Sequence, residues 1–206
     1  MANSRYFWKL ISRSYVASPI GDEAAYKRKL ALTQERLKPD WEALEIACGS
    51  GNTALAHAPF VAHITATDFC GPMMDHGRAR ANDEGVDNIT FDEKRFEDIS
   101  TDKTYDAVLM NSFIHLMRDW KATVRKASEL TRENGIFVSS TVSTESMGFA
   151  AKALLAVMRV LPVLPYVASI SQEALTREIE ANGFEVEENW RPEGGDSVFI
   201  IARKRA

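Results

Sequence analysis

The sequence predicts a single-domain α/β protein. Its sheet is expected to be mostly parallel and seven-stranded, with helices on both faces and one antiparallel strand in a C-terminal hairpin. Two observations predict this class. Short apolar segments alternate with helix-length segments between residues 40 and 142, and two more apolar segments follow residue 183. With 206 residues, 45% of them hydrophobic, the chain suits one domain with a substantial core and leaves no room for a second large one.

Seven apolar segments are expected to form the strands, and five longer segments the helices. The expected strands are residues 43–47, 63–68, 88–93, 105–112, 136–142, 184–190 and 197–203. The expected helices are residues 21–38, 52–58, 70–84, 119–131 and 171–181. Pro39 stops the first helix, and Asn134-Gly135 closes the fourth. Ser171 caps the last helix, and the loop RPEGGD joins the last two strands into a β-hairpin.

Charge and cysteine content restrict the partners and the location. The formal net charge is −4, so no nucleic-acid partner is expected. Residues 1–40 nevertheless carry eight basic residues against four acidic ones. A solvated helix face explains this excess, and the alternative is a segment that meets an anionic ligand or a lipid surface, which leaves peripheral membrane contact open. With two cysteines and no apolar core of a secretory signal near the start, the expected location is the cytoplasm.

The strongest functional signal is LEIACGSGNTA, residues 44–54. A strand runs into Gly49-Ser50-Gly51 and then into a helix, and glycines allow the backbone to turn sharply and approach a bound nucleotide. Asp68 follows at the end of the second strand, where a carboxylate accepts hydrogen bonds from both ribose hydroxyls. A glycine turn that only packs a helix on a sheet is the plain alternative, and the acid in this order makes that alternative weaker.

The glycine pattern alone does not choose the ligand. Gly49, Gly51 and Ala54 also fit the G-x-G-x-x-A pattern of dinucleotide-binding oxidoreductases. Three features favour S-adenosylmethionine over NAD. Glu45, just before the turn, suits a cationic ligand and repels a diphosphate. No separate catalytic domain follows the nucleotide half, and a C-terminal hairpin suits the methyltransferase sheet.

On these residues the chain resembles the class I S-adenosylmethionine-dependent methyltransferases, in the group that includes quinone-ring and other small-molecule methyltransferases. The resemblance runs from about residue 40 to the end and implies a Rossmann-like class I methyltransferase fold with S-adenosyl-L-methionine as cofactor. The family usually has glycine where Ala47 stands. The implied cofactor-binding residues are Glu45, Ala47, Cys48, Gly49, Gly51, Asp68, Phe69, Met73, Phe96, Glu97, Asn111 and Tyr15.

The resemblance also implies a role for several of these residues. Phe69 and Met73 would pack against adenine, and Phe96 would donate its backbone N–H to it. Glu97 would accept from the adenine amino group, although an exposed acidic turn explains Glu97 equally well and the family more often has Gly-Asp-Ala at this turn. Asn111 would offer its carbonyl to the donor. Tyr15, in Arg13-Ser14-Tyr15, would lie near the carboxylate of the donor.

His115 is the candidate general base, because it follows Asn111 by four residues and imidazole titrates near neutrality. A histidine that packs or caps a helix is the alternative. No histidine or cysteine spacing indicates a metal site. The predicted function is therefore methyl transfer to a small, apolar acceptor. The alternatives are an NAD-type dinucleotide-binding oxidoreductase and a noncatalytic S-adenosylmethionine-binding protein.

The single domain, residues 1–206, divides into four expected parts. These are a helical N-terminal cap (1–39), an S-adenosylmethionine-binding core (40–142), a helical insertion or lid (143–170) and a helix with the C-terminal hairpin (171–206). The apolar stretch 148–168 is not expected to span a membrane, because Lys152 and Arg159 interrupt it. It packs on the sheet edge as core, or it covers the acceptor pocket.

Overall fold

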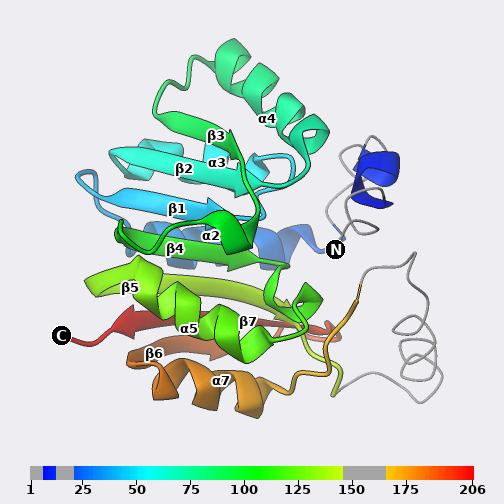
Figure 1. The fold of residues 1–206 in the computed structure, drawn as a ribbon, viewed down its shortest axis with the longest axis vertical. Coiled ribbons are helices and arrows are strands. Elements are labelled where there is room, and N and C mark those ends of the chain that lie inside the picture. Colours follow the sequence, from blue (N-terminus) through cyan, green and yellow to red (C-terminus); the bar gives the residue numbers. More distant parts are fainter. Residues whose placement is uncertain (1–6, 13–20, 146–165) are drawn as a thin grey trace.

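The computed structural model describes residues 7–12, 21–145 and 166–206, and its centre is a seven-stranded sheet (Figure 1). The strands are β1 (Glu42–Ile46), β2 (His63–Asp68), β3 (Ile89–Glu93), β4 (Tyr105–Asn111), β5 (Thr131–Val142), β6 (Phe184–Trp190) and β7 (Ser197–Lys204). Their order is β3-β2-β1-β4-β5-β7-β6. β7 runs antiparallel to β5 and β6, and every other pairing is parallel. The predicted fold class is confirmed.

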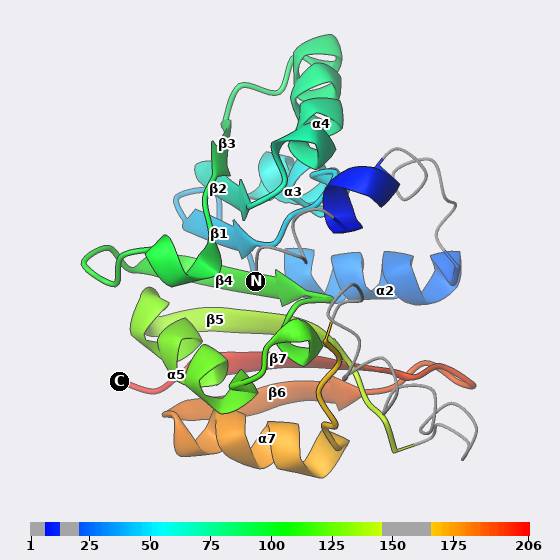
Figure 2. The same cartoon turned by 45° about the vertical axis from the view of Figure 1, so that its right-hand side comes forward.

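Helices cover both faces of this sheet. They are α2 (Glu23–Gln34), α3 (Asn52–His57), α4 (Gly71–Glu84), α5 (Trp120–Leu130) and α7 (Gln172–Ala181), with short 3₁₀ helices η1 (Ala58–Phe60), η2 (Phe96–Asp98) and η3 (Ile114–Leu116). α5 and α7 lie on one face, and α2 and α3 lie on the other (Figures 1 and 2). Each face has its own core of buried apolar side chains. Residues 7–12 are also helical. Within the described ranges, no helix is both long enough and apolar enough to cross a bilayer.

Side-chain caps define where several helices begin. Ser171 Oγ accepts a hydrogen bond from Ala174 N at 3.0 Å, as the sequence predicts. Asp22 caps α2 and Asp119 caps α5 in the same way. An N-cap acceptor satisfies a backbone N–H that has no partner inside its helix. These short polar residues therefore determine the residue at which each helix begins, which the apolar pattern alone does not define.

Two boundaries differ from the sequence expectation. α2 ends at Gln34, four residues before the predicted end, and the chain turns through Arg36 before it reaches Pro39. Arg36 is tied there, because its guanidinium contacts Glu187 and Glu188 of β6. α5 ends at Leu130, and strand pairing begins at once, whereas we expected β5 to begin only at residue 136.

The early start of β5 has a backbone cause. Asn134 adopts a φ of 62°, which lets the chain bend without leaving the sheet. Gly135 follows it, and a Cβ at that position would lie 2.6 Å from Asp106 O on β4. The Asn-Gly pair therefore makes an irregularity inside β5 and does not close the preceding helix.

The carboxyl ends of β1, β2, β3 and β4 meet at one edge of the sheet, and the loops that follow them are tightly wound. Gly49 and Gly51 have positive φ values of 55° and 73°. Ala47 and Ser112, which directly follow β1 and β4, also have positive φ values although they carry a Cβ. Such a backbone costs roughly 1–2 kcal/mol at a non-glycine residue, so strain gathers at this edge.

Gly77 of α4 provides a test of the packing behind the glycine loop. A Cβ on Gly77 would lie 2.6 Å from Ser50 O and 2.9 Å from the Phe91 ring. We therefore expect Gly77→Ala to lower the free energy of unfolding by about 1–3 kcal/mol, although alanine ordinarily favours a helix by about 1 kcal/mol. Chemical denaturation measures this. Asn82→Ala at an exposed position of the same helix is the control, and equal stability of the two variants would refute the close packing.

Candidate functional site

Two adjoining cavities open at this edge of the sheet. The apolar cavity, about 140 Å³, is lined by Trp8, Ala47, Gly49, Asp68, Phe69, Met73, Arg95, Phe96, Glu97, Asn111, Ser112, Phe113, Leu116 and Met117. The polar cavity, about 430 Å³, lies under α2, and its lining includes Tyr26, Lys29, Leu30, Thr33, Glu45, Cys48, His57, Ser140 and Phe199. Ala47, Gly49, Asn111 and Ser112 line both. A single elongated ligand that passes these four shared residues would therefore occupy both cavities.

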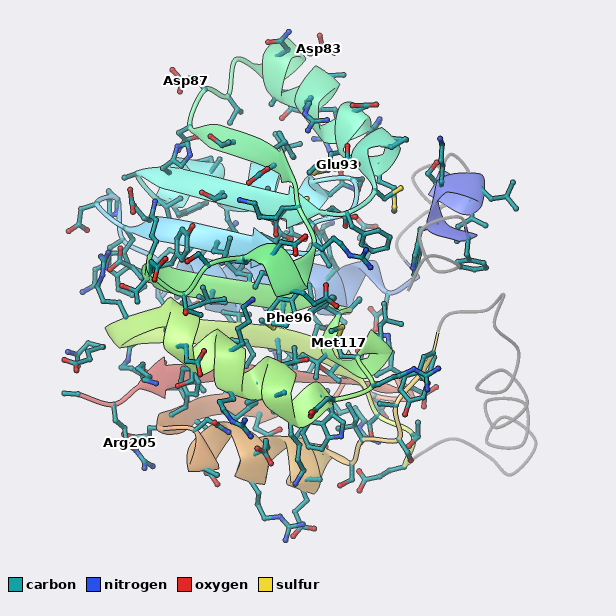
Figure 3. The ribbon with its side chains drawn as sticks, viewed as in Figure 1. Asp83, Asp87, Glu93, Phe96, Met117 and Arg205 are labelled. Atoms are coloured by element: carbon teal, nitrogen blue, oxygen red, sulfur yellow. The ribbon has the colours of Figure 1, made fainter. Side chains whose placement is uncertain are left out.

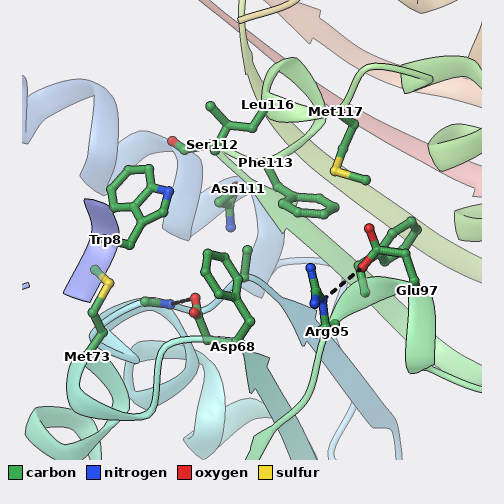
Figure 4. Close-up of a pocket in the computed structure, with 14 residues that line it drawn as sticks. Trp8, Asp68, Met73, Arg95, Glu97, Asn111, Ser112, Phe113, Leu116 and Met117 are labelled. Carbon is green, nitrogen blue, oxygen red and sulfur yellow. Dashed lines mark hydrogen bonds and ion pairs between the residues drawn. The ribbon is translucent and has the colours of Figure 1, made fainter. Parts of the chain in front are cut away.

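Aromatic and sulfur-containing side chains form the walls of the apolar cavity. Trp8 and Met73 lie on one side and Phe113 and Met117 on the other, with Asp68 between them (Figure 4). Met117 and Phe96, both labelled in Figure 3, line this same cavity. Flat apolar walls with a few polar groups suit a flat ring such as a purine.

Phe96 is fixed in this wall from two sides. Its ring packs edge-on against that of Phe113, with 5.3 Å between the centroids. Lys126 of α5 donates a hydrogen bond to Phe96 O at 2.8 Å. The following residue, Glu97, forms a 3.9 Å ion pair with Arg95, and both side chains are partly exposed. The turn after β3 thus offers a rigid apolar surface with a charged rim.

Asp68 joins the loops that follow β1 and β2. Its Oδ2 accepts from Gly49 N at 3.0 Å (Figure 4), and its Oδ1 accepts from Cys70 N at 2.8 Å. The side chain is only 7% exposed. Burial raises the pKa of Asp68, and these backbone N–H groups oppose the rise. Each carboxylate oxygen has a second lone pair, so Asp68 has capacity for two more donors, such as a pair of ribose hydroxyls.

Glu45 lies on β1 at the wall of the polar cavity. It is 3% exposed, and its Oε2 has no hydrogen-bond partner among the described residues. Burial, together with the nearby charge of Asp68, raises the pKa of Glu45 to about 8, although a hydrogen bond from the N–H of Ala54 opposes this rise. A buried acceptor without a donor is costly. A cation in the polar cavity would supply a partner and restore the ionised form.

The structure brings most of the sequence-predicted site residues together. Ala47, Gly49, Asp68, Phe69, Met73, Phe96, Glu97 and Asn111 line the apolar cavity, and Glu45 and Cys48 line the polar one. Gly51 lies outside both linings. A Cβ there would lie 2.6 Å from the Phe91 ring, so Gly51 allows the glycine loop to pack closely against Phe91 of β3. Tyr15 lies outside the described residues. Residues 146–165, which make up most of the expected lid, also lie outside them.

His115 is also outside the lining of either cavity. It is buried, and its Nδ1 accepts a hydrogen bond of 3.4 Å from Val142 N at the end of β5. Its backbone carbonyl accepts from Ala168 N at 2.7 Å. Burial lowers the pKa of His115 to about 4, so the ring is neutral near pH 7. These contacts favour the packing alternative over the role of general base.

Sequence reasoning missed several residues of the linings. Arg95 and Met117 of the apolar cavity belong to loops that follow β3 and β4, and no motif assigns them to the site. Lys29 of the polar cavity was seen only within the basic excess of residues 1–40. That basic excess is the one sequence signal that includes Lys29. It does not single Lys29 out, because the role of this side chain depends on contacts with residues more than 100 positions away.

Comparisons with known proteins agree with this geometry. Residues 43–135 match the family model described as a methyltransferase domain. A demethylmenaquinone methyltransferase of Corynebacterium urealyticum is 29% identical over 175 residues, which are 77% of this chain and 74% of that protein. The uncharacterized methyltransferase YcgJ of Bacillus subtilis is 24% identical over 110 residues, 53% of this chain. The match spans 44% of the length of YcgJ, less than half of that relative.

Solved structures share the fold. The 1,6-didemethyltoxoflavin-N1-methyltransferase of Burkholderia thailandensis, with bound 1,6-didemethyltoxoflavin and S-adenosylhomocysteine, superposes with a TM-score of 0.77. The superposition covers 100% of this chain and 88% of that one, at 17% identity. At this identity the likeness establishes the fold alone.

Asp68→Ala tests the link between the two loops. The substitution leaves the N–H groups of Gly49 and Cys70 buried without their acceptor, so we expect the free energy of unfolding to fall by about 2–4 kcal/mol. Amide hydrogen exchange should accelerate specifically at these two residues. Asp75→Ala, at an exposed position of α4, is the control. Unchanged exchange at Gly49 and Cys70 in Asp68→Ala would show that the carboxylate does not hold the loops.

His115 also generates a prediction about pH. Its folded-state pKa lies below that of an unfolded histidine, so the unfolded chain binds the extra proton and stability falls as pH drops from about 6.5 to about 4. We expect His115→Gln to reduce this acid-induced loss by about 3 kcal/mol relative to the wild type. Denaturation at several pH values measures it, with exposed His76→Gln as control. Parallel profiles of wild type and His115→Gln would mean that His115 is not buried in its neutral form.

Proposed function

We propose that the chain is a class I S-adenosylmethionine-dependent methyltransferase, and that it transfers a methyl group from S-adenosylmethionine to a small acceptor with an apolar ring. The fold, the two cavities and the acid-glycine loop support the donor. The relatives that are named for ring-containing acceptors, a demethylmenaquinone and a didemethyltoxoflavin, support the acceptor class.

The observation that carries the proposal is the unpartnered Oε2 of Glu45, which faces a cavity continuous with the apolar one. S-adenosylmethionine has an ammonium group at one end and adenosine at the other. The apolar cavity would hold adenosine between Phe69 and Phe96, with its ribose on Asp68. The ammonium group would then lie beside Glu45. Each end of the donor thus meets the residues that its chemistry requires.

The same residues disfavour a nicotinamide dinucleotide. Its diphosphate would lie against the glycine loop, between the buried carboxyl groups of Glu45 and Asp68. The carboxylate of Asp68 repels an anionic ligand there, and a diphosphate would provide no positive charge to ionise Glu45. A loop built for diphosphate instead offers backbone N–H groups free of such neighbours, and here Gly49 N is already donated to Asp68.

Bound S-adenosylmethionine supplies a methyl group already activated by the positive sulfonium. The protein therefore has to align the acceptor and exclude water rather than provide a strong acid or base. Ala47, Asn111 and Ser112 form the wall common to both cavities, where the reacting groups would meet. Trp8 lies across from Phe113 and limits the access of water to the apolar side (Figure 4).

No general base is assigned by this proposal, because the contacts of His115 favour packing. A base assists only when the acceptor must lose a proton during transfer. The proposed location is the cytoplasm, supported by the two buried cysteines, Cys48 and Cys70, which form no disulfide.

Calorimetry with S-adenosylhomocysteine tests the proposal through Glu45. At pH 7 a carboxyl group with a pKa of about 8 is mostly protonated. An ammonium beside it lowers the pKa, so we expect binding to release close to one proton per ligand. The dependence of the binding enthalpy on the ionisation enthalpy of the buffer measures this release. Glu45→Gln should bind at least about tenfold more weakly, the loss of one charge-assisted contact, and release no proton.

Two controls sharpen the calorimetry. 5′-Methylthioadenosine lacks the amino-acid end and should bind without proton release. Glu84→Gln, on the exposed side of α4, should behave as the wild type. If NADH binds more tightly than S-adenosylhomocysteine, or if wild type and Glu45→Gln release the same number of protons, the proposed donor site is wrong.

A further inference from the structure

Lys29 carries a cation into the far end of the polar cavity. Its ammonium donates to Ser140 Oγ at 2.9 Å and to Ser197 Oγ at 3.2 Å, and it lies 6.0 Å from the centroid of the Phe199 ring. Ser140 belongs to β5, and Ser197 begins β7. α2 thus places a positive charge over the strands that lie beyond β4, where the cavity is also lined by Leu30.

No carboxylate of residues 7–12, 21–145 or 166–206 forms an ion pair with Lys29, whose two acceptors are neutral hydroxyls. Burial lowers the pKa of Lys29, and the more distant charge of Asp22 only partly opposes this. An ammonium group has three donors, and two of them are used. A cation without a counter-ion at a cavity wall is stabilised when a bound anion supplies the missing charge.

Glu45 and the hydroxyl groups that hold Lys29 lie on different strands of the sheet. Glu45 pairs across the sheet with Leu109 of β4, and β4 pairs with β5, so two strand spacings separate Glu45 from β5. At about 4.8 Å per spacing this is roughly 10 Å. If the ammonium group of S-adenosylmethionine lies beside Glu45, the part of the polar cavity next to Lys29 is therefore left for a second ligand.

From this arrangement, and resting on the proposed function, we propose that Lys29 binds an ionised oxygen of the methyl acceptor. The acceptor class is then a ring that carries an acidic hydroxyl, held as its oxyanion. Phe199 and Leu30 would contact the ring body, while Lys29 would receive the oxyanion beside Ser140. Lys29 acts as a specificity-determining residue that selects and orients the anionic form next to the wall shared with the donor.

The test uses 4-nitrophenol and its neutral analogue 4-nitroanisole, bound to protein saturated with S-adenosylhomocysteine at pH 7. We expect the wild type to bind 4-nitrophenol at least tenfold more tightly than 4-nitroanisole, and its absorption to move toward that of the phenolate. Lys29→Met should bind both probes equally, without the spectral change. Its affinity for S-adenosylhomocysteine should stay within twofold of the wild type.

Lys27→Met is the matched control, because Lys27 lies on the same helix with its side chain 70% exposed. It should retain the preference and the spectral change. Equal binding of the two probes by the wild type would overturn the proposal, and this arm needs no variant to fold. The proposal would also be overturned if Lys29→Met lost affinity for S-adenosylhomocysteine but not for 5′-methylthioadenosine. Lys29 would then bind the carboxylate of the donor. If the wild type binds no S-adenosylhomocysteine, the proposed function itself fails, which is a separate outcome.

Discussion

The carboxylate of Asp68 is the interaction on which the rest of the site depends. Two strands that are neighbours in the sheet end at the same level, and their loops would otherwise be free to separate. By accepting from Gly49 on one side and Cys70 on the other, Asp68 holds the glycine loop over the start of α4. Gly77 and Phe91 support the same loop from behind. The wall between the two cavities is thereby fixed before any ligand contributes.

The site concentrates ionisable groups in environments that do not suit their charged forms. Burial raises the pKa values of Glu45 and Asp68 and lowers those of Lys29 and His57. Shifted pKa values of this kind cluster at binding sites, because a bound ligand of opposite charge stabilises the ionised form of the side chain. Elsewhere the surface follows the ordinary pattern, as in the exposed pair of Arg80 and Glu84. Burial also lowers the pKa of His115, which lines neither cavity, so a shifted pKa marks a ligand site only together with a place in a cavity wall.

The sequence predicted the fold well because its signals are local. Alternating apolar segments, the Ser171 cap and the final hairpin all depend on neighbours within a few residues. The predictions were wrong where long-range contacts decide the outcome. After the end of α2, Arg36 contacts distant residues of β6, and at β5 a local bend at Asn134 lies inside the strand instead of ending the helix before it.

The same distinction applies to the candidate site, where local sequence patterns predict some residues and tertiary packing places the others. The loop after β1 and the acid after β2 follow from spacing alone, and they lie where expected. The spacing of residues in the sequence does not predict that Gly51 packs against Phe91. Nor does it predict that His115 lies between β5 and Ala168, because both depend on tertiary packing. Lys29 is the clearest case, because its partners lie 111 and 168 positions further along the chain.

The position of β7 bears on how the protein matures. β7 follows β6 in the chain, yet it lies between β5 and β6, so β6 has no neighbour in the sheet until β7 is synthesised. Ser197 and Phe199 belong to this strand and complete the polar cavity. On the ribosome, the nascent chain can therefore fold its first five strands while one wall of the polar cavity is still missing. A ligand that needs both cavities would find them only after β7 has been inserted between β5 and β6.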